Sequence, residues 1–179
     1  MKEFEELYQL YQKDIYFFLL KLTGYEVSLA EELTQETFYQ AFFSLKNFRG
    51  ECAIKSWLCQ IAKNTYYKYL REVVKQRNLK IKVEVKQEEK TVSDIVEEKQ
   101  MIIHIRKIME DLDEKNRSIV EYRLFSQMPY KEIGYLLGIR EATVKVLFSR
   151  AKAKIQMQLK EEFGFVAVNE KLRNYYKNI

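Results

Sequence analysis

Basic side chains gather in two separate parts of this chain, and in the first of them they recur at helical spacing. Asn64, Lys68, Arg71 and Lys75 are spaced by four, three and four residues, which places them on one face if this stretch is helical. A second basic zone runs from residue 119 to the C-terminus, with 11 basic and 6 acidic side chains. Two such zones predict two contacts with a polyanion, and phosphate binding is the chemistry that their side chains offer.

The residues that usually carry enzyme chemistry are few and are not spaced for it. Cys52 and Cys59 are the only cysteines, and His104 is the only histidine. This set fits no metal motif, no Cys–His nucleophile and no disulfide framework, and the sequence has no glycine loop that would cradle a phosphate. The sequence therefore predicts no metal, no cofactor, no catalytic residue and no small-molecule substrate. Two reduced cysteines are typical of a cytoplasmic protein.

The stretch YKEIGYLLGIREATVKVLFSR has the pattern of a helix-turn-helix. Such a unit needs a small residue where its helices cross, a residue that tolerates positive φ at the turn, and apolar residues at fixed later positions. With Tyr130 as position one, Gly134 and Gly138 occupy positions five and nine. Val144 and Leu147 then supply apolar side chains at positions fifteen and eighteen. A generic helical hairpin is the alternative interpretation.

The second helix of this unit would enter the major groove of DNA by its N-terminal part. The residues expected to face DNA are Arg140, Glu141, Lys145, Val146 and Ser149, with Arg150, Lys152 and Lys154 placed for phosphates. Arginine or lysine commonly pairs with guanine, and glutamate can accept from cytosine. A second interpretation has Glu141 only charging or capping the helix N-terminus, and both interpretations stay open.

Apolar residues at spacings of three and four predict an all-α fold, and only 5 glycines and 1 proline argue against a turn-rich β architecture. Ser28 followed by Glu31 has the pattern of a capping box at a helix start. The predicted helices cover residues 4–22, 28–45, 54–76 and 94–109, one more begins near 113, and the helix-turn-helix supplies two. No apolar run is long enough for a transmembrane helix, and the acidic N-terminus has no secretory signal.

The pattern divides the chain into two small helical domains and two connecting or terminal segments. The predicted divisions are a domain of residues 1–78, a linker of 79–93, a domain of 94–161 and a tail of 162–179. Ile81, Val83 and Val85 alternate as a short strand would, but an extended, flexible linker is favoured because no partner strand is nearby. Packing on the second domain is the default expectation for the apolar tail, and docking of an inhibitor is the alternative.

Three motifs in order resemble the extracytoplasmic-function (ECF) subfamily of sigma-70 RNA polymerase sigma factors. The first is Glu32-Leu33-Thr34-Gln35-Glu36-Thr37-Phe38, the second is Phe48-Arg49-Gly50, and the third runs from Trp57-Leu58 through Ile61-Ala62-Lys63-Asn64. The helix-turn-helix and the preceding RSIVEYRLF resemble region 4 of the same family. The resemblance covers about residues 3 to 160 and implies an alternative sigma factor, which directs core RNA polymerase to specific promoters and is not an enzyme.

The resemblance assigns a partner to the acidic helix. In the family this helix docks onto the β′ clamp helices of RNA polymerase, while region 4 binds the β flap. The residues carried over as polymerase-binding are Glu32, Leu33, Gln35, Glu36 and Phe38. A polar face that is merely solvated is the alternative, but an acidic face so near DNA-binding elements fits protein better than phosphate.

The resemblance also assigns promoter DNA to the two basic zones. The residues expected to bind the −10 element and its separated non-template strand are Phe48, Asn64, Lys68, Arg71 and Lys75. Tyr66, Tyr67 and Tyr69 could stack bases or lie in the core, and the core is preferred for Tyr69. The family flips a base into a pocket formed by the loop at 47–55 and the neighbouring helix, where Asn64 matches a pocket position. Trp57 suits core packing better than stacking on DNA.

The helix-turn-helix is expected to read the −35 element, although its sequence departs from the family pattern. Arg140 replaces the usual capping serine, Ala142 replaces a glycine, and Val146 leaves one base-facing position apolar, where a thymine methyl would fit. A free-standing helix-turn-helix regulator is the competing function, but no heptad run supplies its dimer interface. The family further implies an anti-sigma factor, which is often membrane-bound.

Overall fold

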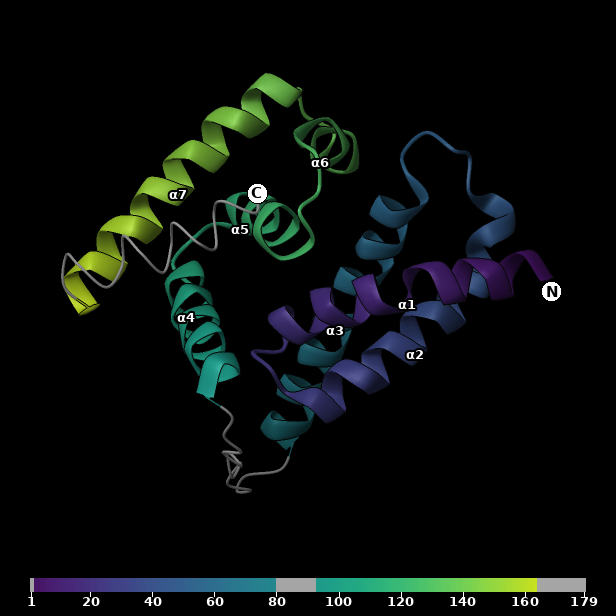
Figure 1. The fold of residues 1–179 in the computed structure, drawn as a ribbon, viewed down its shortest axis with the longest axis horizontal. Coiled ribbons are helices and arrows are strands. Elements are labelled where there is room, and N and C mark those ends of the chain that lie inside the picture. Colours follow the sequence, from purple (N-terminus) through teal and green to yellow (C-terminus); the bar gives the residue numbers. More distant parts are fainter. Residues whose placement is uncertain (1, 80–92, 164–179) are drawn as a thin grey trace.

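The computed structural model describes residues 2–79 and 93–163, and every regular element in these ranges is helical (Figure 1). The first half of the chain contains α1 (Lys2–Leu22), α2 (Val27–Ser44), the 3-10 turn η1 (Leu45–Asn47) and α3 (Ile54–Leu79). The second half contains α4 (Ser93–Met109), α5 (Glu114–Val120), the π-helical turn η2 (Glu121–Phe125), α6 (Tyr130–Leu137) and α7 (Glu141–Phe163). The all-α prediction is confirmed.

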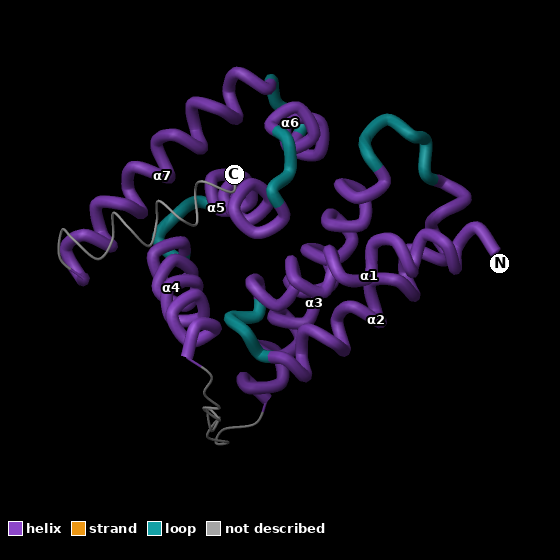
Figure 2. The backbone as a smooth tube through the Cα atoms, viewed as in Figure 1, coloured by secondary structure: helices purple, strands orange, loops and turns teal. Residues whose placement is uncertain are grey.

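Helices α1, α2 and α3 pack against one another as a three-helix unit (Figure 2). Ile15 and Phe18 of α1, Ala41 of α2 and Leu58 of α3 are completely buried between them, as the apolar spacing predicted.

The predicted capping box at the start of α2 is wrong. Helix α2 begins at Val27 instead, with Glu26 at the N-cap and no side-chain cap bond. Two consecutive residues before it have positive φ, which turns the chain sharply and starts the helix early.

The second half is built around α7, which packs on α4, α5 and α6. Helix α5 begins where the sequence predicted, because the Asp113 side chain caps it by accepting from Asn116 N–H at 3.1 Å. The fully buried side chains of this half include Ile105, Ile119, Ile133, Val144 and Ile155, one or more from each helix. A packed core therefore fixes the orientation of α6 and α7.

The two halves also pack against each other. The ring of Phe18 in α1 stacks on Tyr122 of η2 with centroids 6.3 Å apart. Three side-chain hydrogen bonds between the halves accompany this contact. Lys63 donates to Ser118 at 2.7 Å, and Tyr67 donates to the carboxylate of Glu121. Arg106 donates to the Tyr66 hydroxyl at 2.8 Å. The buried apolar residues of both halves form one continuous cluster. The contact thus combines a continuous apolar cluster with paired polar groups.

Some predictions concern parts of the chain outside the described residues. These are the linker or strand around Ile81, Val83 and Val85, and the apolar part of the tail beyond residue 163. Within the described ranges, no helix has the length and apolar character needed to cross a bilayer. In the same ranges, histidine, cysteine and acidic side chains nowhere gather in a group that could hold a metal ion.

Candidate nucleic-acid and protein interfaces

The geometry of α6, the turn and α7 is that of a helix-turn-helix. Gly138 ends α6 with φ of 65°, the left-handed conformation that glycine adopts at little cost. The Ile139 N–H donates to the Gly134 carbonyl at 2.9 Å, which draws the turn against α6. A Cβ atom at Gly134 would lie 2.7 Å from the Ile139 carbonyl oxygen, so this position requires glycine. Both glycine predictions are confirmed, and the helical-hairpin alternative is disfavoured.

The predicted reading face of α7 points away from the core. Arg140, Glu141, Lys145, Val146, Ser149 and Arg150 are exposed, whereas Lys152 is half-buried. Val144 and Phe148 are buried beneath them, as expected. Glu141 lies in the first turn of the helix and pairs with Lys145 at 2.6 Å. A contact of Glu141 with a base would therefore compete with this ion pair. The favourable interaction of the Glu141 carboxylate with the helix N-terminus persists whether or not the carboxylate contacts a base.

Helix α3 presents the predicted basic face. Asn64, Lys68, Arg71 and Lys75 are all exposed, and their spacing places them along one side of the helix. The tyrosines of this helix do not lie on this exposed basic face. Tyr66 and Tyr67 bond to Arg106 and Glu121 of the second half of the chain, so their rings are unavailable for base stacking. Tyr69 is half-buried against the core and faces α2.

The loop between η1 and α3 borders a cavity of about 280 Å³. Phe48 and Trp57 form one wall with ring centroids 5.1 Å apart, so Trp57 packs against the loop and also lines the cavity. Gln60 lies one helical turn before Asn64 and lines the cavity, whereas Asn64 itself does not. Tyr135 of α6 completes the lining. Sequence reasoning missed Gln60 and Tyr135, and only the spacing of Gln60 from Asn64 could have indicated the former.

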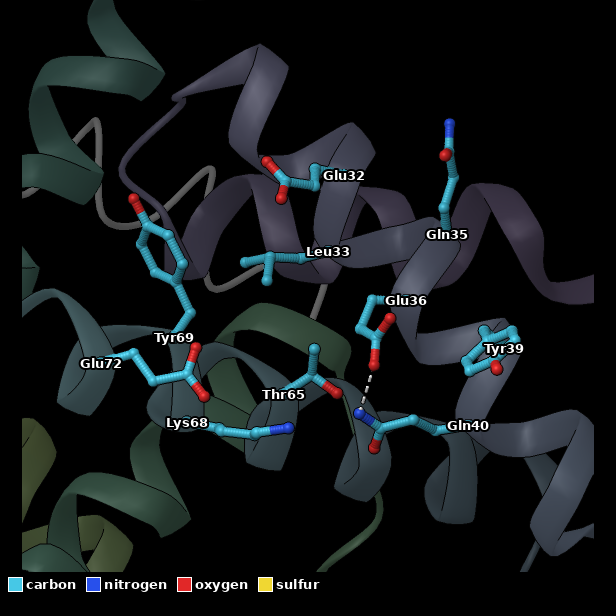
Figure 3. Close-up of a pocket in the computed structure, with 10 residues that line it drawn as sticks. All are labelled: Glu32, Leu33, Gln35, Glu36, Tyr39, Gln40, Thr65, Lys68, Tyr69 and Glu72. Carbon is cyan, nitrogen blue, oxygen red and sulfur yellow. Dashed lines mark hydrogen bonds between the residues drawn. The ribbon is translucent and has the colours of Figure 1, made fainter.

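A groove of about 510 Å³ lies between α2 and α3, and every predicted protein-binding residue except Phe38 lines it (Figure 3). Glu32 and Gln35 of α2 are exposed, and Glu36 accepts a hydrogen bond from Gln40 at 2.7 Å. Lys68 of α3 faces this acidic edge across the groove (Figure 3). The groove thus joins the predicted polymerase-binding face of α2 to the basic face of α3.

Two of the residues assigned to polymerase binding lie in the core. Leu33 is 4% exposed and Phe38 is 3% exposed. The Phe38 ring packs edge-on against Tyr8, with centroids 4.8 Å apart, so it holds α2 on α1 and presents no contact surface. Leu33 still reaches the floor of the groove. Tyr39, which is 62% exposed beside the groove, is a surface residue that the sequence analysis did not single out.

Sequence comparison identifies two known regions in the order in which they occur here. Residues 7–76 match sigma-70 region 2, and residues 103–155 match sigma-70, region 4. The chain is 27% identical over 152 residues to the ECF RNA polymerase sigma factor SigM of Bacillus subtilis, covering 85% of this chain and 92% of that protein. It is 27% identical over 161 residues to the RNA polymerase sigma factor YlaC of the same organism, covering 87% and 91%.

Solved structures share the fold. The sigma factor RpoE from Bartonella quintana, solved with the anti-sigma factor NepR, superimposes with a TM-score of 0.64 at 21% identity, covering 89% of this chain and 98% of that chain. CnrH, solved with the cytosolic domain of CnrY, superimposes with a TM-score of 0.63 at 18% identity, covering 89% of each chain. The agreement extends over both halves, so it includes the helices that carry the candidate surfaces.

Proposed function

The chain belongs to the sigma-70 family of RNA polymerase sigma factors and is an ECF-type alternative sigma factor, and we propose that three surfaces divide its work. As a sigma factor it binds core RNA polymerase, directs it to promoters and is not itself an enzyme. The three surfaces are the α2 edge of the groove, the basic face of α3 with its loop, and the N-terminal part of α7. Since polymerase acts in the cytoplasm, we place the protein there as well.

The α2 edge is our proposed site for the β′ clamp helices. Glu32, Gln35 and Glu36 supply its polar surface, and Tyr39 adds an exposed aromatic ring at its end. Exposed aromatic side chains are enriched at protein interfaces, and the carboxylates of this edge would repel DNA phosphates. Leu33 supports this surface from beneath, and Phe38 acts only by holding α2 in place.

The basic face of α3 is our proposed site for the −10 element. Lys68, Arg71 and Lys75 would follow the phosphates of the non-template strand, and Asn64 would meet a base edge. We assign the flipped base to the cavity walled by Phe48 and Trp57, because aromatic rings provide the stacking that offsets the cost of extrusion.

The exposed side of α7 is our proposed reader of the −35 element. Arg140 and Lys145 are placed for guanine or phosphate, and Val146, which is 50% exposed, is placed for a thymine methyl. Arg150 and Lys152 would add phosphate contacts that fix the register. Two DNA-binding surfaces that each bind weakly give selective promoter binding when one polymerase holds both of them.

We also propose that an anti-sigma factor holds this chain inactive. One sigma factor of the same fold, RpoE, was solved in complex with the anti-sigma factor NepR, and CnrH, which shares the fold, was solved in complex with the cytosolic domain of CnrY.

The observation that carries the proposed function is that an exposed acidic edge and two exposed basic surfaces lie on three different helices, with the acidic edge of α2 facing the basic side of α3 across the groove. Binding of the purified chain to core RNA polymerase tests it, comparing wild type with Gln35→Ala/Glu36→Ala. We expect the double substitution to weaken binding by roughly 10-fold to 100-fold, which would place these two side chains among the few interface residues that supply most of the binding energy. Run-off transcription from genomic fragments then maps the promoters.

Glu6→Ala/Gln9→Ala is a matched control, because it removes one carboxylate and one amide from the exposed side of α1. It should bind polymerase like wild type. If neither wild type nor control binds polymerase and the chain instead binds duplex DNA as a dimer, it is a free-standing regulator and the sigma-factor assignment fails.

A further inference from the structure

An ion pair lies at the N-terminal end of α7, on the surface that we assign to the −35 element. The Lys145 ammonium is 2.6 Å from the Glu141 carboxylate, which precedes it by about one helical turn. The side chains of Lys145 and Glu141 are 55% and 44% exposed, so both reach the solvent where DNA would bind. Val144 and Phe148 of the same turns are buried, which fixes the side of α7 that faces outward.

The Tyr130 ring at the start of α6 lies beside this ion pair. Helix α6 packs against α7 (Figure 1), and Lys145 Nζ lies over the Tyr130 ring, 5.9 Å from its centroid. The ring is itself held in place, because it packs on Phe148 with centroids 5.7 Å apart and the Arg123 guanidinium lies 4.5 Å from its centroid. An ammonium at this position is attracted to the electron-rich face of the ring. Lys145 is therefore drawn by a carboxylate on its own helix and by a ring on the neighbouring helix.

These two contacts favour binding of the Lys145 ammonium to a base over binding to phosphate. A lysine ammonium is a compact charge on a flexible stem, so without further contacts it has no directional preference for a base edge. Contacts that hold it before DNA binds reduce the conformational freedom that is lost on binding. The N-terminal end of a recognition helix enters the major groove, where guanine presents two acceptors, N7 and O6. An ammonium held at this end of α7 is therefore placed for guanine.

The geometry also separates the two roles that the sequence left open for Glu141. Its Oε1 atom already faces Lys145, so accepting from a cytosine amino group would draw the carboxylate away from the ammonium. An exposed ion pair of this kind contributes little to folding stability. The effect of the pair therefore lies in where it keeps the Lys145 ammonium.

We propose that Glu141 is a positioning residue for −35 recognition, which holds the Lys145 ammonium together with the Tyr130 ring so that Lys145 contacts one guanine. Glu141 itself contacts no base. The inference rests on the proposed function of α7 as the reader of the −35 element. It predicts that Glu141 and Lys145 determine the preference at one and the same base pair.

The base preference of the complete polymerase complex tests this prediction. The probe is a labelled promoter mapped by run-off transcription, made with each of the four base pairs in turn at every −35 position, and anisotropy measures its binding. We expect wild type to prefer guanine at one position, and Lys145→Ala and Glu141→Ala each to reduce that preference at least about fivefold. The double variant Glu141→Ala/Lys145→Ala should be no less selective than Lys145→Ala alone, because the two side chains act as a unit.

The affinity for unfavourable promoters distinguishes positioning from a structural role. Glu141→Ala removes a negative charge near the phosphates, so it should bind the least favoured promoter at least as tightly as wild type. Disruption of the helix-turn-helix would instead weaken binding to every sequence. Glu161→Ala is the matched control, because it removes an exposed carboxylate from the other end of α7 and should leave the preference unchanged.

Substitution of Tyr130 tests the second contact. Tyr130→Phe keeps the aromatic ring and should keep the guanine preference, whereas Tyr130→Leu should reduce it at the same position as Glu141→Ala. Thermal unfolding followed by circular dichroism verifies that each variant remains folded under the binding conditions.

The outcomes separate this inference from the proposed function. Loss of a cytosine preference at a different base pair in Glu141→Ala would show that Glu141 contacts a base, and this would overturn the inference. Unchanged preferences in Glu141→Ala, or losses that add in the double variant, would overturn it as well. A polymerase complex that contains the wild-type chain and binds no promoter would instead contradict the proposed function.

Discussion

Lys63 of α3 and Glu121 of η2 form an ion pair across the two halves of the chain, with their charged atoms 3.7 Å apart. Only 12% and 5% of their side-chain surfaces are exposed. Burial raises the pKa of the Glu121 carboxyl, while Lys63 and the hydrogen bond from Tyr67 act against that rise. A carboxylate in this position is tolerated only with these partners, so the pair restricts how the halves can meet.

Replacing Lys63 with methionine should destabilise the protein by about 3 kcal/mol, because the Glu121 carboxylate would remain buried without its cation. The free energy of unfolding from urea titrations measures this. The double variant Lys63→Met/Glu121→Gln should recover most of the loss, since no charge is then buried unpaired. Additive losses in the double variant would show that the two side chains are not coupled.

The raised pKa of Glu121 predicts how stability depends on pH. A carboxyl whose folded pKa lies above its ordinary value near 4.5 holds its proton in the native state after the unfolded chain has released it. Its contribution to stability is therefore complete below about pH 4.5 and is lost as the pH rises through the folded pKa. The groups that face it are Lys63 and Tyr67 from α3, Arg106 from α4 and Arg117 from α5.

Glu121→Gln cannot titrate, so the stability of wild type relative to this variant should decline as the pH rises from about 4.5 toward neutrality. Urea unfolding at several pH values in this range measures the difference. Glu5→Gln provides the comparison, because it changes an exposed carboxyl on α1. A constant difference between wild type and Glu121→Gln across the range would contradict the prediction.

Gly134→Ala should disrupt the helix-turn-helix, because its methyl group would lie 2.7 Å from the Ile139 carbonyl oxygen. We expect a loss of about 1 to 3 kcal/mol in unfolding free energy together with weaker binding to −35 DNA in the polymerase complex. Gly138→Asn is the comparison variant for Gly134→Ala. Nothing lies within 4 Å of a Cβ atom at Gly138, and asparagine tolerates its positive φ, so that variant should remain close to wild type.

Arg71→Ala should reduce the salt dependence of promoter binding. An arginine that neutralises one phosphate contributes about one unit to the slope of log K against log salt, and the substitution should remove roughly that much. Titrations of the polymerase complex with a labelled promoter at several salt concentrations provide the slope. Lys107→Ala removes an exposed positive charge from α4, away from the proposed DNA surfaces, and should leave the slope unchanged.

The sequence by itself determined the helices, the helix-turn-helix and the three candidate surfaces. These features depend on local spacing: Gly134 and Gly138 fix the turn within a few residues, and the basic face of α3 follows from steps of three and four. The local sequence also led us to expect two side chains at the surface that are buried. Phe38 and Leu33 belong to a motif of surface residues, yet α1 covers the ring of Phe38 and both side chains are buried, because a motif does not reveal which of its members face the core.

Only the tertiary structure decided how the halves meet. Lys63 and Glu121, Tyr67 and Glu121, and Tyr135 and Glu51 pair over distances of more than fifty residues in sequence, and no periodic pattern records such partners. Each of these side chains reads in isolation as an ordinary surface or core residue. Their pairing depends on the relative position of two packed helical units, which is set by the sum of many contacts around Phe18 and Tyr122 and by no single motif.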